Sequence, residues 1–252
     1  MSEKAFFNGI IIGWFLLTVA VFLILLFIVA PYGRHFRGGW GPSINNKLGW
    51  IIMEAASPLV FFIFFILGNN AITITTIVFL VLWQVHYIHR AFIYPFGLRS
   101  KIQGMPIIII AFGLIFNTVN GYLNGRYIFT LSGSYGNEWL GDPRFIIGVL
   151  LFITGFIINR HADKILHNMS AGESGYNIPY GGFYRWISSP NYFGEIMIWS
   201  GWAMATWSLT GLAFAVWTIA NLVPRARSHQ AWYHENFPDY PSNRKTLLPG
   251  LW

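Results

Sequence analysis

Long apolar runs, separated by short polar segments, dominate the chain. Seven of these runs approach the length of about 20 residues that a helix needs to cross the apolar core of a bilayer. The predicted spans are residues 8–30, 49–67, 71–96, 105–125, 145–160, 194–209 and 211–226. Because the last two are almost contiguous, they predict a tight helical hairpin. The pattern therefore predicts an all-α integral membrane protein with seven transmembrane helices.

The composition agrees with a membrane protein rather than a soluble one, because 55% of the 252 residues are hydrophobic and the mean hydropathy is +0.51. The first apolar run is too long for the core of a signal peptide and lacks a small-residue cleavage site, so it is kept as a span. No internal repeat or long linker divides the chain, which predicts a single domain over residues 1–252. The absence of cysteine excludes disulfides and thiolate catalysis.

The basic residues give the predicted spans an orientation. Twelve of the 16 basic residues fall on one side of the spans, whereas Lys4, Arg126 and Arg144 fall on the other. An excess of Lys and Arg marks the cytoplasmic side of a membrane protein. The asymmetry therefore places the N-terminus outside and the C-terminus in the cytoplasm, and it explains the net charge of +7 without nucleic-acid binding.

A polar block at residues 159–195 stands out in this apolar chain. Polar side chains near membrane spans must be hydrated, paired or occupied by a polar ligand. The predicted orientation places this block and the basic C-terminal segment on the same cytoplasmic face. Together they predict a binding site for a large, anionic cytosolic molecule.

Several positions around this block suit polar recognition. Asn159 and Asp163 follow the fifth span, while Asn191 and Glu195 precede the sixth, at a helix N-terminus that favours anionic or amide groups. The glycine-rich residues 175–186 fit an ordinary loop as well as a ligand cradle. No glycine fingerprint follows a strand, which excludes a Rossmann site. The His-x-Asp pair at His161 has no further ligand at metal-binding spacing, so no metal site is predicted.

Glu54 is an acidic residue inside the second span, where a carboxyl group usually faces a cavity or a partner. It is either a structural carboxylate, paired or reaching the interface, or a carboxyl group with a raised pKa that can hold and donate a proton. Tyr87, in the third span, is a candidate hydrogen-bond partner for Glu54. His86 and His89 have metal-ligand spacing but lack a third ligand, and His89 and Tyr94 also fit an interfacial aromatic belt.

Five segments, in this order and spacing, give the chain a family resemblance. They are VHYIHRAFIY, INRHADKIL, SSPNYFGEI, MATWSL and HENFPDYPSNRKTLLP. They are similar to the steroid 5-alpha-reductase (3-oxo-5-alpha-steroid 4-dehydrogenase) family from the second span to the C-terminus. The resemblance implies seven transmembrane helices and an active site open to the cytosol and partly to the bilayer. It also implies NADPH-dependent reduction of the carbon–carbon double bond of a 3-oxo-4-ene steroid.

The resemblance also implies roles for individual residues. Glu54 and Tyr87 match the catalytic pair, which would donate hydrogen bonds to the enolate oxygen formed by hydride transfer. The implied NADPH-binding positions are Arg90, Tyr94, Asn159, Asp163, Tyr176, Asn191, Glu195, Arg225, His229 and Tyr233. The cofactor-binding part would lie mainly in residues 159–252 and the substrate pocket mainly in the first four spans. The expected partners are an enone lipid substrate and membrane lipids, with no nucleic acid and no obligate protein partner.

Three departures from the family pattern bear on specificity. Met53 replaces a Gln that is common in the family, and this change affects substrate fit. An Arg that is common in the family is absent from the segment HNMSAGE, and Asn177 replaces another, so the contacts to the 2′-phosphate of NADPH are affected. The preference for NADPH over NADH therefore stays open. Alternatives are an enoyl-CoA or polyprenol-type lipid reductase of the same family and an S-adenosylmethionine enzyme like isoprenylcysteine methyltransferases. A channel or sensor would need a continuous polar path through several spans, and the sequence has none.

Overall fold

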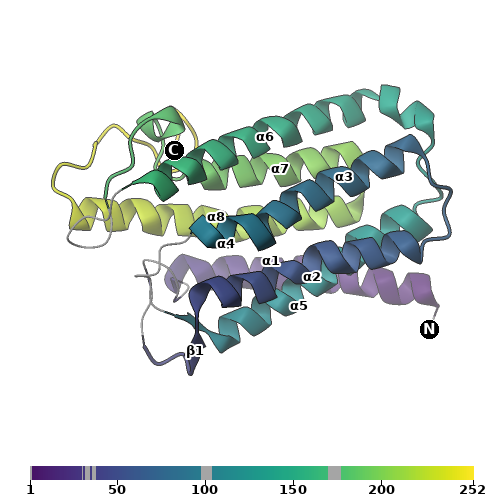
Figure 1. The fold of residues 1–252 in the computed structure, drawn as a ribbon, viewed down its shortest axis with the longest axis horizontal. Helices are drawn as coiled ribbons and strands as arrows, with labels where there is room; N and C mark the ends of the chain where they lie inside the picture. Colours follow the sequence, from purple (N-terminus) through teal and green to yellow (C-terminus); the bar gives the residue numbers. More distant parts are fainter. Residues whose placement is uncertain (1, 30, 32–34, 36–37, 98–103, 170–176) are drawn as a thin grey trace. The chain divides into compact units, whose positions relative to one another are not determined.

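The computed structural model describes residues 2–29, 31, 35, 38–97, 104–169 and 177–252. Within these ranges the regular secondary structure is helical apart from two very short strands, β1 (Ser43–Ile44) and β2 (Met105–Pro106), which pair antiparallel (Figure 1). The prediction of an all-α protein is therefore confirmed.

Each predicted apolar run corresponds to one helix, except that the run of residues 71–96 contains both α3 and α4. They are α1 (Glu3–Phe27), α2 (Asn46–Ile66), α3 (Ile74–Ile88), α4 (Tyr94–Gly97), α5 (Ile107–Arg126), α6 (Pro143–Asn168), α7 (Pro190–Thr206) and α8 (Leu209–Asn236). The π-helical turn η2 (His89–Ile93) joins α3 to α4, and a second one, η3 (Tyr127–Leu131), continues α5. Two short 3₁₀ helices, η4 (Asn137–Gly141) and η5 (Gly182–Arg185), lie in the connections.

Six helical segments of the described chain are long and apolar enough to cross a membrane, which is the make-up of a multi-pass membrane protein. They are Glu3–Phe27, Asn46–Ile66, Ile74–Gly97, Ile107–Leu131, Pro143–Asn168 and Leu209–Asn236. The remaining long helix, α7, has 17 residues. The seventh span and the orientation of the termini stay predictions.

The chain forms two compact units. One comprises residues 1–29 and 146–252, and the other comprises residues 30–145. The first predicted span thus belongs with the C-terminal half, although the sequence analysis groups it with the substrate pocket. The single-domain organisation and the assignment of the pocket to the first four spans stay predictions.

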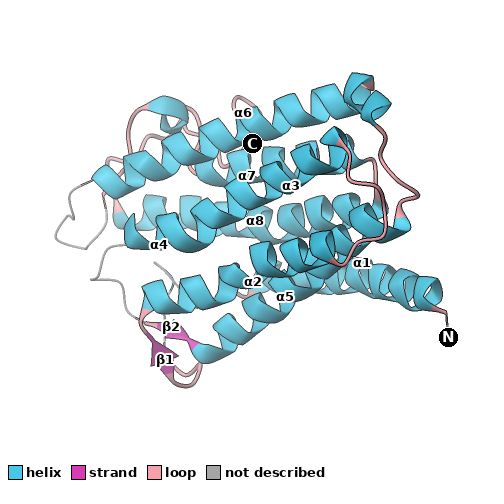
Figure 2. Cartoon of the chain, turned by 45° about the vertical axis from the view of Figure 1, so that its right-hand side comes forward, coloured by secondary structure: helices cyan, strands magenta, loops and turns pink. Residues whose placement is uncertain are grey.

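In the unit of residues 30–145, α2 packs against α5 and α3. Small residues on α5 allow this close approach, because a Cβ at Gly121 would lie only 3.2 Å from the Ser57 carbonyl oxygen. Figure 2 shows β1 and β2 together at the start of α2 and α5. The strand pair therefore joins the beginnings of these two helices.

In the other unit, α8 packs against α7 and α1. The predicted hairpin is confirmed, because α7 ends at Thr206 and α8 begins at Leu209. Trp207 turns the chain with a left-handed backbone (φ 44°), and the Ser208 side chain caps α8 by accepting the Gly211 N–H.

Glycine pairs set the contact between α6 and α7. A Cβ at Gly155 would lie 2.6 Å from the Gly194 carbonyl oxygen, and one at Gly148 would lie 2.6 Å from the Gly201 carbonyl oxygen. Glycine is needed where two helix backbones come this close, because any side chain would overlap the facing carbonyl. This contact brings the polar end of α6 against the first turns of α7.

Candidate active site

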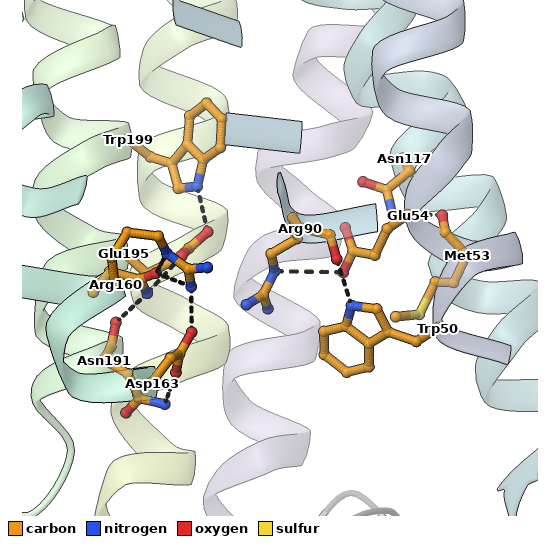
Figure 3. Close-up of polar contacts among 11 residues, drawn as sticks. Trp50, Met53, Glu54, Arg90, Asn117, Arg160, Asp163, Asn191, Glu195 and Trp199 are labelled. Carbon is orange, nitrogen blue, oxygen red and sulfur yellow. Dashed lines mark hydrogen bonds and ion pairs between the residues drawn. The ribbon is translucent and has the colours of Figure 1, made fainter. Parts of the chain in front are cut away.

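Glu54 lies buried on α2, with 8% of its surface exposed. Its Oε1 atom is 3.7 Å from Nε of Arg90 (Figure 3). The Arg90 guanidinium in turn lies over two aromatic rings, 4.9 Å from the Trp50 centroid and 5.3 Å from the Tyr94 centroid. The carboxyl group therefore faces a cation held by aromatic rings.

The π-helical turn η2 places Arg90 beside α2. In this turn the Tyr94 N–H donates to His89 O, and the residue that follows, Pro95, has no N–H to donate. The Arg90 carbonyl instead accepts a hydrogen bond from Trp50 Nε1 on α2, at 3.1 Å. Turns of this kind are frequent at functional sites. The sequence analysis missed the turn, although the His89–Pro95 segment contains the proline that favours it.

Tyr87 is buried in the last turn of α3. Its ring centroid lies 5.1 Å from that of Trp83 and 5.1 Å from that of His86. This packing fixes the ring among aromatic side chains. The hydrogen bond between Tyr87 and Glu54 stays a prediction.

A second polar cluster joins α6 and α7 within the other unit. Asn159 Nδ2 donates to the Asn191 carbonyl at 2.8 Å and to Glu195 Oε2 at 3.1 Å. Asn191 Nδ2 reaches Asp163 Oδ1 at 3.4 Å. Asn159 and Asp163 are each 3% exposed, and Glu195 is 8% exposed. The structure thus brings together four residues that the sequence assigns to the cofactor.

Two further residues belong to this cluster and were missed by the sequence analysis. Arg160 donates to Asn159 Oδ1 at 2.8 Å and forms a short ion pair with Asp163 (Figure 3). Trp199 Nε1 donates to Glu195 Oε1 at 2.9 Å. The spacing of three residues between Arg160 and Asp163 is that of a helical ion pair, which is the signal for this contact in the sequence.

The three predicted residues on α8 divide into two groups. Arg225 and His229 meet at Tyr192, with the guanidinium carbon 5.8 Å and the imidazole centroid 5.2 Å from its ring centroid. Tyr233 instead stacks on Tyr240, with centroids 4.9 Å apart. The remaining predicted cofactor residue, Tyr176, lies outside the described residues.

The C-terminal segment is bound to the residues that precede α7. Tyr240 donates to Ser188 Oγ at 2.8 Å, and burial raises the pKa of its phenol. Arg244 is 3% exposed and lies between the rings of Tyr180 and Tyr240. Aromatic packing therefore buries this basic side chain of the C-terminal segment. This segment holds the N-terminal end of α7 and its site residues.

Comparison with known proteins gives a consistent result. A family model described as 3-oxo-5-alpha-steroid 4-dehydrogenase matches residues 103–252. The steroid 5-alpha-reductase of Gossypium hirsutum is 37% identical over 256 residues, covering 100% of this chain and 99% of the relative. The 3-oxo-5-alpha-steroid 4-dehydrogenase 1 of Bos taurus is 38% identical over 93% of each chain. The Homo sapiens protein of that name is 38% identical over 87% of this chain and 85% of its own. The chain therefore belongs to the 3-oxo-5-alpha-steroid 4-dehydrogenase family.

Proposed function

We propose that this protein reduces the 4,5 double bond of 3-oxo-4-ene steroids, with NADPH as the source of hydride. The family consists of oxidoreductases that act on a CH–CH group, and the chain matches relatives over its whole length. The observation that carries the proposal is the buried Glu54 carboxyl group beside Arg90. A carboxyl group in such surroundings suits an acid that acts on a ketone in an apolar pocket.

The reaction needs a group that stabilises negative charge on the substrate. Hydride adds to carbon 5 of the enone, the electrons of the double bond move toward the 3-oxo oxygen, and a proton then adds to carbon 4. Protonated Glu54 and Tyr87 donate hydrogen bonds to that oxygen, which becomes a stronger acceptor as the charge develops. Arg90 compensates the charge of the Glu54 carboxylate whenever the Glu54 proton is absent.

The polar cluster on α6 and α7 has the chemistry to hold the cofactor. When bound, reduced nicotinamide supplies the hydride. Amide and carboxylate groups of Asn159, Asn191 and Glu195 suit a carboxamide and ribose hydroxyls, which both donate and accept hydrogen bonds. Arg160 compensates the charge of Asp163, which lowers the repulsion that an anionic cofactor would meet. Arg225 and His229, gathered at Tyr192, suit phosphate groups.

Deuterium tracing with the purified protein tests this function. NADPH deuterated at the transferred position of the nicotinamide is given with three substrates: a 3-oxo-4-ene steroid, the same steroid without the 3-oxo group, and an enoyl lipid. We expect reduction of the first substrate alone, with deuterium at carbon 5, because only its double bond is conjugated to a ketone in a sterol-sized ring system. Reduction of the enoyl lipid but not of the enone steroid would contradict the proposed substrate class.

A further inference from the structure

Asn117 links α5 to the backbone of α2 immediately before Glu54. Its Nδ2 atom donates a hydrogen bond of 2.8 Å to the carbonyl oxygen of Met53 (Figure 3). Asn117 is 3% exposed, so this bond is shielded from competing water. The contact fixes the backbone position of the residue that directly precedes the proposed catalytic acid.

Pro58 removes one backbone hydrogen bond from the middle of α2, where side chains of neighbouring helices also bind α2 carbonyl groups. Proline has no N–H, so residue 58 cannot make the ordinary helical bond to the carbonyl of residue 54, and a proline inside a helix favours a kink. Side chains from α3 bind the carbonyl groups of residues 57 and 58 on α2. Trp83 Nε1 donates to Ser57 O at 3.4 Å, and Gln84 Nε2 donates to Pro58 O at 2.9 Å. Asn117, on α5, makes the same kind of contact with the carbonyl group of Met53, which precedes Glu54 in the sequence.

The surroundings of Asn117 indicate that its amide serves a specific purpose. Within the described part of the chain, its Oδ1 atom is buried without a hydrogen-bond partner. An apolar residue would avoid this cost of a desolvated acceptor, which is about 1–3 kcal/mol. Gly113 and Gly121 lie one helical turn on either side, and they bring α5 close enough to α2 for a short amide to reach Met53.

We infer that Asn117 is a positioning residue, which holds the Met53–Glu54 backbone so that the Glu54 carboxyl group points at the substrate ketone. This inference rests on the proposed role of Glu54 as the acid. Asn117 itself contacts neither substrate nor cofactor in this account and acts only through α2. Loss of the amide therefore misdirects the carboxyl group without removing it.

A double-mutant cycle between Asn117→Ala and Glu54→Gln tests the inference. Asn117→Ala should lower kcat about 10- to 100-fold, the scale of a misplaced catalytic group, with little change in steroid KM or NADPH affinity. In the Glu54→Gln background it should cause little further loss, because the group that Asn117 positions is already impaired.

Asn124→Ala is the matched control, since Asn124 is a buried asparagine of the same helix whose amide bonds to Asn120 within α5. We expect its effect on kcat to be small and equal in both backgrounds. Asn117→Leu, which keeps the branching at Cγ but not the donor, serves as the second variant and should reproduce the loss.

Two results would overturn the inference: wild-type kcat in folded Asn117→Ala and Asn117→Leu, or an equal loss in both backgrounds, which would mean a general structural role. A near wild-type rate for Glu54→Gln alone would instead refute the proposed mechanism.

Discussion

At the scale of single residues, Asp163 is the residue that connects the polar cluster. It binds both Arg160 on its own helix and Asn191 on α7. We predict that Asp163→Ala weakens NADPH binding by about 0.5–3 kcal/mol, the range for loss of one hydrogen bond. Truncation also removes the ion-pair partner of the partly exposed Arg160 side chain. A fluorescence titration of NADPH measures the change. Asp239→Ala, at an exposed carboxylate, is the control, and equal affinities of both variants would contradict the assignment of this cluster.

Sequence reasoning could find site residues whose charge is unexpected at their position, and it missed residues whose charge is expected there. Glu54, Asp163 and Glu195 are charges in or beside apolar spans, so their cost alone indicated a function. Arg160 and Arg244 are also basic residues in the expected cytoplasmic segments, where the positive-inside rule already explained them. The burial of Arg244 between aromatic rings and the ion pair of Arg160 with Asp163 depend on partners that only the folded chain brings together.

At the scale of secondary-structure elements, the close contact of α6 and α7 determines the geometry of the polar cluster. We predict that Gly155→Ala pushes these helices apart, because its Cβ would lie 2.6 Å from Gly194 O. Overpacking of this kind costs about 1–3 kcal/mol of stability. The shift also separates Asn159 from Asn191 and Glu195, so NADPH affinity should fall together with the melting temperature.

Gly13→Ala is the control for this substitution. Gly13 lies on α1 with nothing within 4 Å of its Cβ position, and alanine there favours the helix by up to about 1 kcal/mol. We expect its melting temperature and NADPH affinity to be unchanged or slightly higher. Thermal unfolding in detergent and the same NADPH titration measure both variants. Equal behaviour of the two would show that the α6–α7 contact tolerates a methyl group.

The apolar pattern predicted the existence of the helices better than their ends. The sixth predicted span starts at residue 194 and the seventh ends at 226, whereas α7 starts at Pro190 and α8 continues to Asn236. Hydropathy detects the apolar part of a helix, but the backbone hydrogen bonds continue through its polar ends. The π-helical turn at His89–Ile93 changes the hydrogen-bond partner without changing the hydropathy, which leaves Pro95 as its signal in the sequence.

At the scale of the whole molecule, both compact units belong to the reductase. The family model covers residues 103–252, which exclude Glu54 and Tyr87. The match to the Gossypium hirsutum relative covers 100% of the chain and therefore spans the positions of these two residues. The cytoplasmic position of the C-terminus and of the cofactor site stays a prediction from the distribution of basic residues.

The central claim is that Glu54 acts as a neutral acid on the ketone of the substrate, and Glu54→Gln tests it most directly. The amide keeps the size of the side chain but is a much weaker acid, so it loses most of the interaction that strengthens in the transition state. We predict that kcat falls by about 10²–10³, equivalent to about 2.7–4 kcal/mol, while NADPH affinity and steroid KM change little. Glu138→Gln, at an exposed glutamate of η4, should keep the wild-type kcat. A folded, NADPH-binding Glu54→Gln enzyme that reduces the enone at a near wild-type rate would contradict the account and make Glu54 a structural residue.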